Sequence, residues 1–278
     1  MPTIEENIKT WEHDYDWSQQ GDEWSQSCGG PDMQWYGSIL PRVHTFLPAA
    51  TILEIAPGFG RWTQYLKDHC TRLIIVDLNP KCINHCQTRF RECSHISYHV
   101  NDGKSLAMVP PDSLDFIFSY DSLVHAEYDA IEAYLSQFAA LLRPDGVGII
   151  HHSNFGACTP SLLTKSLMKI PLLGPWLSRS PRLKAYQNEH WRASSMTAQK
   201  FADLCVKHGL QCISQELINQ SQYLLNDCIS VFVKANSHRS RQTVHLTNLH
   251  FAQEVSLLHA LSPLYGGAGF RPSPPKPA

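Results

Sequence analysis

The sequence predicts an α/β fold in which helices cover both faces of a mostly parallel β-sheet. Three observations lead to this prediction. Between residues 51 and 154, short apolar runs alternate with longer amphipathic runs, which is typical of parallel strands joined by crossover helices. Two glycines, Gly58 and Gly60, follow the first apolar run directly, as in a strand–turn–helix unit. The second apolar run ends in an acidic residue, Asp77.

Each element of this unit follows from its local pattern. Pro80 stands in the first turn of a helix, where its missing N–H costs little. In a later helix the apolar residues form one stripe at helical spacing: Ile131, Tyr134, Leu135, Phe138, Leu141 and Leu142. We expect strands at residues 51–56, 72–78, 96–100, 114–125 and 146–154, and helices at 60–70, 80–93 and 129–146.

The alternation of short apolar runs and longer amphipathic runs ends after residue 154. Residues 155–190 mix proline, serine and apolar residues over a length that exceeds an ordinary connection, so we expect a partly helical cap. A helix at 197–210, two strands at 211–218 and 228–235 that pair as an edge hairpin, and a helix at 248–267 follow. The predicted parts are an aromatic N-terminal helical lid (1–44), the core (45–154), a cap or substrate-binding insertion (155–196), a C-terminal part of the core (197–265) and a disordered tail (266–278).

Charge and composition exclude several classes of protein. The 278 residues carry a formal net charge of −2, so no polycationic surface is expected and nucleic acid is not predicted as a partner. The most apolar segment after the core strands, residues 170–177, is far below the roughly 18–20 residues of a transmembrane helix. Nine cysteines without a CxxC pair, behind a polar N-terminus that lacks a signal peptide, predict free thiols in a cytoplasmic protein.

The glycine turn favours a ligand that is not a dinucleotide. A dinucleotide site needs a small residue three positions after the second glycine, where this chain has Thr63. Glu54, on the preceding strand, would repel phosphates. We therefore expect a cationic ligand without phosphate groups.

At these residues the sequence resembles the class I S-adenosylmethionine-dependent methyltransferases. The stretch LEIAPGFGRW is similar to the first motif of that family, and the resemblance extends over about residues 45–155. It implies a Rossmann-like fold with S-adenosylmethionine as cofactor, Glu54 near the methionyl amine, Asp77 on both ribose hydroxyls and Asp102 on the adenine amino group. A carboxylate suits a diol because it accepts two hydrogen bonds. The cofactor-binding residues expected on this basis are Glu54, Ala56, Gly58, Gly60, Arg61, Asp77, Leu78, Asp102, Gly103 and Ser119.

The N-terminal segment is unusually aromatic. Because aromatic faces attract cations and a sulfonium is a cation, we expect Trp24 or Trp35 to cover the cofactor as part of a lid. A helix pair packed on the face of the sheet is an equal alternative.

Histidines supply the candidates for a catalytic base, since a hydroxyl acceptor must lose its proton. His125 follows the fourth strand, whereas His151 and His152 end the fifth and must point to opposite faces of the sheet. We expect His125 or His152 to be the base, with His152 preferred of the strand pair. His151, His190 and Arg192 are predicted to bind substrate. For any one of these histidines, an ordinary hydrogen-bonded surface or core position is the alternative.

A metal-dependent variant of this chemistry is a further alternative. Asp121, the third predicted catalytic residue, would then ligate a divalent ion together with His125 and His152. We do not favour it, and predict no metal ligands, because a single carboxylate is a poor site for a hard cation.

Together these patterns predict O-methylation of a hydroxyl or carboxylate of a small natural product or sugar. N-methylation of a small amine or peptide-derived metabolite is the alternative within the same class, and a non-catalytic cofactor-binding module is the alternative outside it. Lysines and arginines in the apolar cap also suit an amphipathic or anionic acceptor, such as a short peptide or lipid-linked sugar. The same apolar residues are compatible with a homodimer contact.

Overall fold

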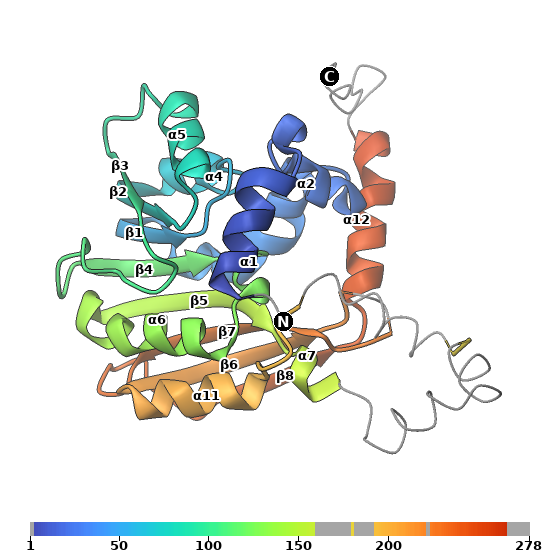
Figure 1. Cartoon of the computed structure of the whole chain (residues 1–278). Helices are drawn as coiled ribbons and strands as arrows, with labels where there is room; N and C mark the ends of the chain where they lie inside the picture. Colours follow the sequence, from blue (N-terminus) through green and yellow to red (C-terminus); the bar gives the residue numbers. More distant parts are fainter. Residues whose placement is uncertain (1–2, 159–178, 181–191, 221–222, 266–278) are drawn as a thin grey trace.

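An eight-stranded sheet forms the centre of the computed structural model, which describes residues 3–158, 179–180, 192–220 and 223–265 (Figure 1). The strands lie in the order β3-β2-β1-β4-β5-β7-β6-β8. Their bounds are β1 (Ala49–Ile55), β2 (Cys70–Asp77), β3 (Ile96–Val100), β4 (Leu114–Ser119), β5 (Leu142–Ser153), β6 (Leu210–Ile218), β7 (Asp227–Lys234) and β8 (Val244–Asn248). Only β7 runs antiparallel to its neighbours, so the predicted mostly parallel α/β fold is confirmed.

Helices and short helical turns surround this sheet. The helices are α1 (Ile4–Lys9), α2 (Pro31–Gln34), α3 (Leu40–Val43), α4 (Thr63–Leu66), α5 (Pro80–Arg89), α6 (Tyr128–Leu141), α7 (Phe155–Cys158), α11 (Ala198–Lys207) and α12 (Phe251–Tyr265). Short segments of 3-10 or π geometry are η1 (Thr10–Asp14), η2 (Trp17–Gln19), η3 (Asp22–Cys28), η4 (Trp35–Ile39), η5 (His44–Phe46), η6 (Lys67–His69) and η7 (Leu123–His125). None of the described helices is both long enough and apolar enough to cross a membrane.

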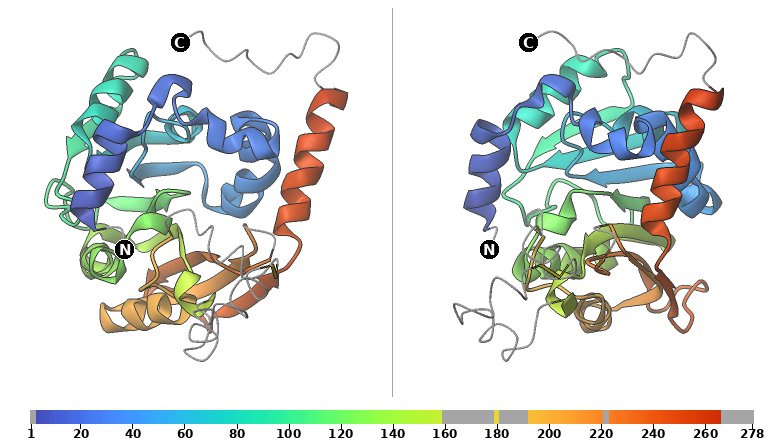
Figure 2. Two further views of the ribbon diagram at one scale, coloured as in Figure 1. Left: turned by 45° about the vertical axis from the view of Figure 1, so that its right-hand side comes forward. Right: turned by 90° about the vertical axis from the view of Figure 1, so that its right-hand side faces the viewer.

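Two apolar clusters cover the opposite faces of the sheet. Alternation along β1 sends Leu53 to one cluster and Ile52 to the other. The first cluster contains the apolar residues of α6 and α11, which lie side by side in both views of Figure 2. The second contains residues of α4, α5 and the N-terminal segment, including the fully buried Trp35. Both faces are therefore closed to solvent, which leaves the ends of the strands for a site.

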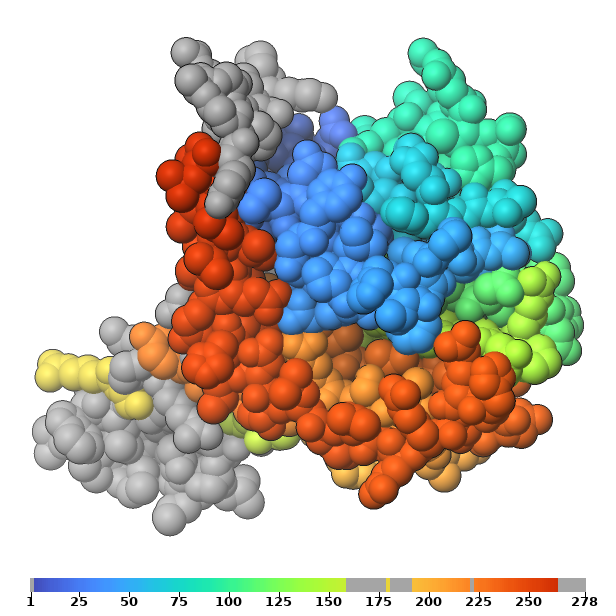
Figure 3. Space-filling view, turned by 180° about the vertical axis from the view of Figure 1, so that it is seen from behind, coloured from blue at the N-terminus to red at the C-terminus, as the bar shows by residue number. Residues whose placement is uncertain are grey.

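The C-terminal helix α12 packs against the N-terminal segment, as the rear view in Figure 3 shows. The contact depends on two glycines, because a Cβ on Gly37 would lie 2.4 Å from Leu258 and one on Gly29 would lie 2.8 Å from Ser262. Arg42 of α3 adds ion pairs to Glu216 of β6 at 2.7 Å and to Glu254 at 2.9 Å. The N-terminal segment is thereby attached to the rest of the fold.

Several predicted boundaries were wrong for identifiable reasons. Helix α6 ends at Leu141, and residues 142–146 belong to β5 because Leu142 pairs with Leu114 across the sheet. The β6–β7 hairpin exists, but β8 pairs outside β6, so the hairpin does not form the edge. β8 was missed although Val244 and Leu246 alternate with polar residues, because the run is only five residues long and four of these residues are exposed.

Most of the predicted cap and the whole predicted tail, residues 266–278, lie outside the described residues. The N-terminal segment consists of short helices and turns in place of the helix pair considered from sequence. None of the nine cysteines, all of which lie in the described part of the chain, forms a disulfide.

Replacing Phe138 with alanine is expected to lower the free energy of unfolding by about 3–5 kcal/mol. Phe138 is 1% exposed and stacks on Phe232 with ring centroids 5.4 Å apart, so its loss leaves a cavity between α6 and the sheet. Urea denaturation measures this change. Val206→Ala, on the exposed side of α11, is the control and should change stability by no more than about 0.5 kcal/mol. Equal losses in the two variants would contradict this account of the core.

Candidate active site

A cavity of about 1580 Å³ opens at the carboxyl ends of β1, β2 and β4. The residues that follow these strands line it, and α1, Trp11, Tyr15 and Trp24 of the N-terminal segment cover it. Ligands of open parallel sheets bind at this end of the strands. The cavity exceeds the roughly 300–1,000 Å³ typical of a small-molecule site, so it has room for two small molecules side by side.

Two non-glycine residues at this end have left-handed backbones. Ala56 follows β1 with φ 57°, and Asp121 follows β4 with φ 64°. Both line the cavity. The Ser122 hydroxyl donates to the Ala56 carbonyl at 2.8 Å and joins the two turns. Such strain costs about 1–3 kcal/mol per residue and gathers at functional sites, which marks this strand edge as one.

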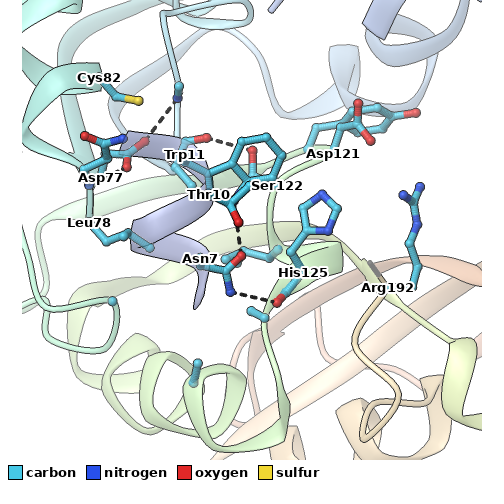
Figure 4. A pocket seen from close by; sticks show the side chains of 18 of the residues that line it. Asn7, Thr10, Trp11, Asp77, Leu78, Cys82, Asp121, Ser122, His125 and Arg192 are labelled. Carbon is cyan, nitrogen blue, oxygen red and sulfur yellow. Dashed lines mark hydrogen bonds between the residues drawn. The ribbon is translucent and has the colours of Figure 1, made fainter. Parts of the chain in front are cut away.

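Asp77 ends β2 at one end of the cavity (Figure 4). One carboxylate oxygen accepts the Asn79 N–H at 2.8 Å and the other accepts the Gly58 N–H at 3.2 Å. Burial raises the pKa of Asp77 to about 6, although these N–H groups oppose the rise. Each oxygen keeps a further lone pair, so the carboxylate can accept two hydrogen bonds from a vicinal diol. Leu78 lies beside it and lines the cavity too.

The glycine turn is packed against protein side chains. A Cβ on Gly60 would lie 2.5 Å from the ring of Phe90, and one on Gly58 would lie 3.2 Å from the ring of Trp17. Gly58 lines the cavity and Gly60 does not. The prediction that both glycines admit a ligand is corrected for Gly60, whose missing side chain is required by α5 packing.

Glu54 is directed into the fold and does not line the cavity. It is 1% exposed and accepts the Thr63 hydroxyl at 2.6 Å. Burial raises the pKa of Glu54 to about 8. The predicted contact of Glu54 with a methionyl amine is therefore not supported. Thr63 is the hydrogen-bond partner of this carboxyl. It is the same residue whose presence in the sequence disfavoured a dinucleotide.

The predicted residue Arg61 occupies the opposite end of the cavity from Asp77. Its Nη2 lies 2.8 Å from Oδ2 of Asp121, and its guanidinium lies over the rings of Trp24 and Trp62 at 5.2 and 4.5 Å. Burial alone would raise the pKa of Asp121, but the charges of Arg61 and Arg192 oppose that rise, and the pKa is lowered. Asp121 is therefore an ionised carboxylate that Arg61 holds in place at the cavity wall.

A second buried ion pair adjoins the first. Arg192 binds Asp227 of β7 through Nε at 3.0 Å and Nη2 at 2.9 Å, and Arg192 lines the cavity. His151 lies between the pairs: its Nδ1 accepts the Asp121 N–H at 3.1 Å, and its Nε2 is 3.6 Å from Asp227. His151 is buried behind the wall and does not itself line the cavity, which corrects its predicted direct contact with substrate.

His152 is excluded as a base by its position. It points to the opposite face from His151, as the alternation predicted, and stacks on Phe201 with ring centroids 4.2 Å apart. Its Nε2 hydrogen-bonds to Ser230 at 2.8 Å, and burial lowers its pKa to about 4. His125, by contrast, lines the cavity, where its ring lies 5.4 Å from that of Trp11 (Figure 4).

The alternative metal site is not assembled. Asp121 and His125 are at the cavity, but His152 is on the other face of the sheet. In the described part of the chain, no group of three or more His, Cys, Asp or Glu residues could hold a metal ion.

Three further predicted residues do not line the cavity. Trp35 is 0% exposed and stacks on Tyr65 in the core, because the segment that follows η3 packs on the face of the sheet. Ser119 is fully buried within β4. The exposed Asp102 accepts the N–H groups of Lys104 and Ser105 through Oδ1 and lies outside the cavity lining. Gly103 and Trp24 do line the cavity, and His190 lies outside the described residues.

Other lining residues were not predicted. Asn7 of α1 donates to the His125 carbonyl at 3.3 Å and to the Thr3 carbonyl, and so holds α1 over the cavity. Glu23, Glu127 and Asn226 also line it. They come from three segments far apart in the sequence, and no local pattern distinguishes them from surface residues. The aromatic composition of the N-terminal segment was the only signal for this wall.

Part of the chain is similar to a known protein family and to curated proteins. A family model described as a methyltransferase domain matches residues 52–146. Nodulation protein S of Sinorhizobium fredii is 25% identical over 137 residues, which are 49% of this chain and 60% of that protein. The chain thus spans less than two thirds of the length of this curated relative.

Solved structures share the fold. The 1,6-didemethyltoxoflavin-N1-methyltransferase of Burkholderia thailandensis, determined with 1,6-didemethyltoxoflavin and S-adenosylhomocysteine, is 18% identical with a TM-score of 0.53, over 83% of this chain and 86% of that one. A protein of Pyrococcus horikoshii is 15% identical with a TM-score of 0.51, over 81% and 95%. At these identities the likeness establishes the architecture and not the substrate.

The pH dependence of stability tests the burial of Glu54. Because its pKa rises from 4.5 in the unfolded chain to about 8, the folded protein retains a proton that the unfolded chain has lost, and stability falls as pH rises through this window. We expect Glu54→Gln to remove this pH dependence. The free energy of unfolding of the variant, relative to that of the wild type, should then rise by up to about 1.4 kcal/mol per pH unit within this window. Urea unfolding at several pH values measures the gain, with the surface variant Glu132→Gln as control. Parallel curves for Glu54→Gln and wild type would contradict the raised pKa.

Proposed function

We propose that this chain, which belongs to the class I S-adenosylmethionine-dependent methyltransferase family, transfers a methyl group from S-adenosylmethionine to a small molecule bound in the same cavity. One observation carries the proposal above all. Asp77, placed to accept a diol, and the strained Asp121 lie at two ends of a single cavity large enough for two molecules. A transferase of this kind must bind donor and acceptor together.

The residues at the Asp77 end fit the cofactor. The Asp77 carboxylate suits the ribose hydroxyls, and Leu78 and Gly103 supply a narrow, uncharged surface for the adenine. The turn at Ala56 and Gly58 is placed for the methionine part. When bound, S-adenosylmethionine supplies a methyl group on a positively charged sulfur, and Trp24 offers an aromatic face to such a charge.

The Asp121 end is left for the acceptor. Asp121, His125 and Arg192 line this part of the cavity, and Figure 4 shows them apart from Asp77 and Leu78. His125 is the remaining histidine of the predicted bases that faces the cavity. We assign it the removal of a proton from the acceptor, because a neutral imidazole accepts protons near neutral pH. The lid formed by α1 excludes water during transfer.

Calorimetric titration with S-adenosylmethionine and S-adenosylhomocysteine tests this function. We expect both to bind the wild type, and Asp77→Asn to weaken binding by about 10–100-fold, since a hydrogen bond to a charged group contributes about 1.5–3 kcal/mol. Asp145→Asn is the matched control, because Asp145 lies outside the cavity and pairs with His238 on the surface. NAD is the control ligand and should not bind. Absence of S-adenosylmethionine binding to a folded wild type would refute the proposed function.

A further inference from the structure

We propose that the acceptor is an amine, bound as an ammonium ion by Glu23, Glu127 and Asn226. This inference rests on the proposed methyl transfer and specifies its substrate class. It favours nitrogen over the hydroxyl or carboxylate oxygen expected from the sequence. Four properties of the described cavity support it: its unpartnered oxygens, its charge, its aromatic wall and the place of His125.

Unpartnered acceptor oxygens gather in this cavity. Four buried side-chain oxygens that belong to lining residues have no hydrogen-bond partner in the described structure: Glu23 Oε2, Glu127 Oε1, Gln220 Oε1 and Asn226 Oδ1. Asn226 is only 5% exposed. Leaving a buried acceptor unsatisfied is unfavourable, so these positions require donors. An ammonium group has up to three donors and no acceptor, and therefore suits them better than a carboxylate does.

The carboxylates on this wall are held in place by the protein. One oxygen of Glu127 accepts from the N–H and the hydroxyl of Ser195, which leaves the other for a ligand. Ser195 follows Arg192 by three residues, and Arg192 binds Asp227, the neighbour of Asn226. Glu127 and Asn226 are thus connected through one short segment. On the N-terminal segment, Glu23 accepts the Tyr15 hydroxyl through one oxygen and leaves the other free.

The excess of negative charge in the cavity also favours a positively charged acceptor. Six carboxylates line it against four cations. Three of the cations are already paired within the protein, since Arg61 binds Asp121, Arg192 binds Asp227 and Lys104 binds Asp129. A carboxylate acceptor would compete with these pairs, whereas an ammonium ion adds the positive charge that the cavity lacks.

Aromatic rings complete the wall beside Glu23. Trp11, Tyr15 and Trp24 all line the cavity, with ring centroids 5.0 to 5.7 Å apart from one another. Ring faces attract ammonium ions, and the attraction grows when water is excluded. A carboxylate beside aromatic rings, as Glu23 is beside Tyr15, suits an organic cation.

The chemistry then balances without a further reactant. The bound ammonium gives one proton to a base, for which His125 is placed at the same end of the cavity. The freed nitrogen lone pair forms a bond to the methyl carbon, the carbon–sulfur bond breaks, and its electron pair stays on sulfur. The products are a methylated ammonium, which releases its proton to solvent, and S-adenosylhomocysteine.

The experiment uses protein saturated with S-adenosylhomocysteine and compares two probes of the same shape, benzylammonium chloride and benzyl alcohol. Calorimetry should show benzylammonium binding at least tenfold more tightly. Glu23→Gln and Glu127→Gln should each weaken benzylammonium binding at least fivefold and leave the affinity for S-adenosylhomocysteine unchanged. Glu132→Gln is the matched control, because Glu132 lies on α6, which begins directly after Glu127, but pairs with Lys207 outside the cavity.

A variant that is expected to bind more tightly controls for the misfolding of the other variants. Asn226→Asp adds a negative charge at the site and should tighten benzylammonium binding, a result that unfolding cannot produce. Equal affinity for the amine and the alcohol, or a preference that survives both glutamine variants, would overturn the inference while leaving methyl transfer intact. Failure of S-adenosylhomocysteine to bind in the first step would instead refute the proposed function.

Discussion

A buried network of charges at the carboxyl ends of β4 and β5 and the amino end of the antiparallel β7 is the constraint on which the site depends. Asp227 is fully buried and is stabilised by Arg192, while His151 connects this pair to the backbone of Asp121, whose side chain holds Arg61. Removing one member of such a network leaves an uncompensated buried charge, which costs about 3–5 kcal/mol. The network thus joins the glycine turn, two strand ends and the segment at Arg192 into one wall.

This wall explains why the strained conformation of Asp121 persists. A left-handed aspartate is unfavourable by itself, but its N–H donates to His151 and its carboxylate accepts a hydrogen bond from Arg61. The tautomer of His151 is set by the same contact, since Nδ1 accepts and the proton lies on Nε2, toward Asp227. The geometry of the acceptor end is therefore determined by residues behind the wall as well as by those that line it.

The N-terminal segment closes the cavity from the other side, and its position depends on the C-terminus of the described chain. α12 packs on this segment through Gly29 and Gly37, and Arg42 ties it to β6. The rings of Trp11, Trp17 and Trp24 then meet over the turn that carries Gly58. Because Trp17 stacks on Phe59 at 4.3 Å, the lid and the glycine turn form one packed unit.

Much of the architecture was determined by the sequence itself. Parallel strands buried on both faces leave continuous apolar runs, and glycines or acidic residues mark their carboxyl ends, so the α/β fold, the turn at Gly58 and the position of Asp77 were predictable from local pattern. The opposite faces of His151 and His152 followed from strand alternation. β8 escaped prediction because it is a five-residue edge strand whose apolar residues, Val244 and Leu246, are exposed.

Only the tertiary structure decided which polar and aromatic residues reach the cavity. His152, Trp35 and Glu54 resemble site residues in sequence, but each is held inside the fold by a partner from another element: Phe201, Tyr65 and Thr63. Glu23, Glu127 and Asn226 resemble surface residues, yet they line one cavity. The physical reason is that the direction of a side chain depends on contacts between distant segments. Local periodicity records which face of an element is buried, but not what that face meets.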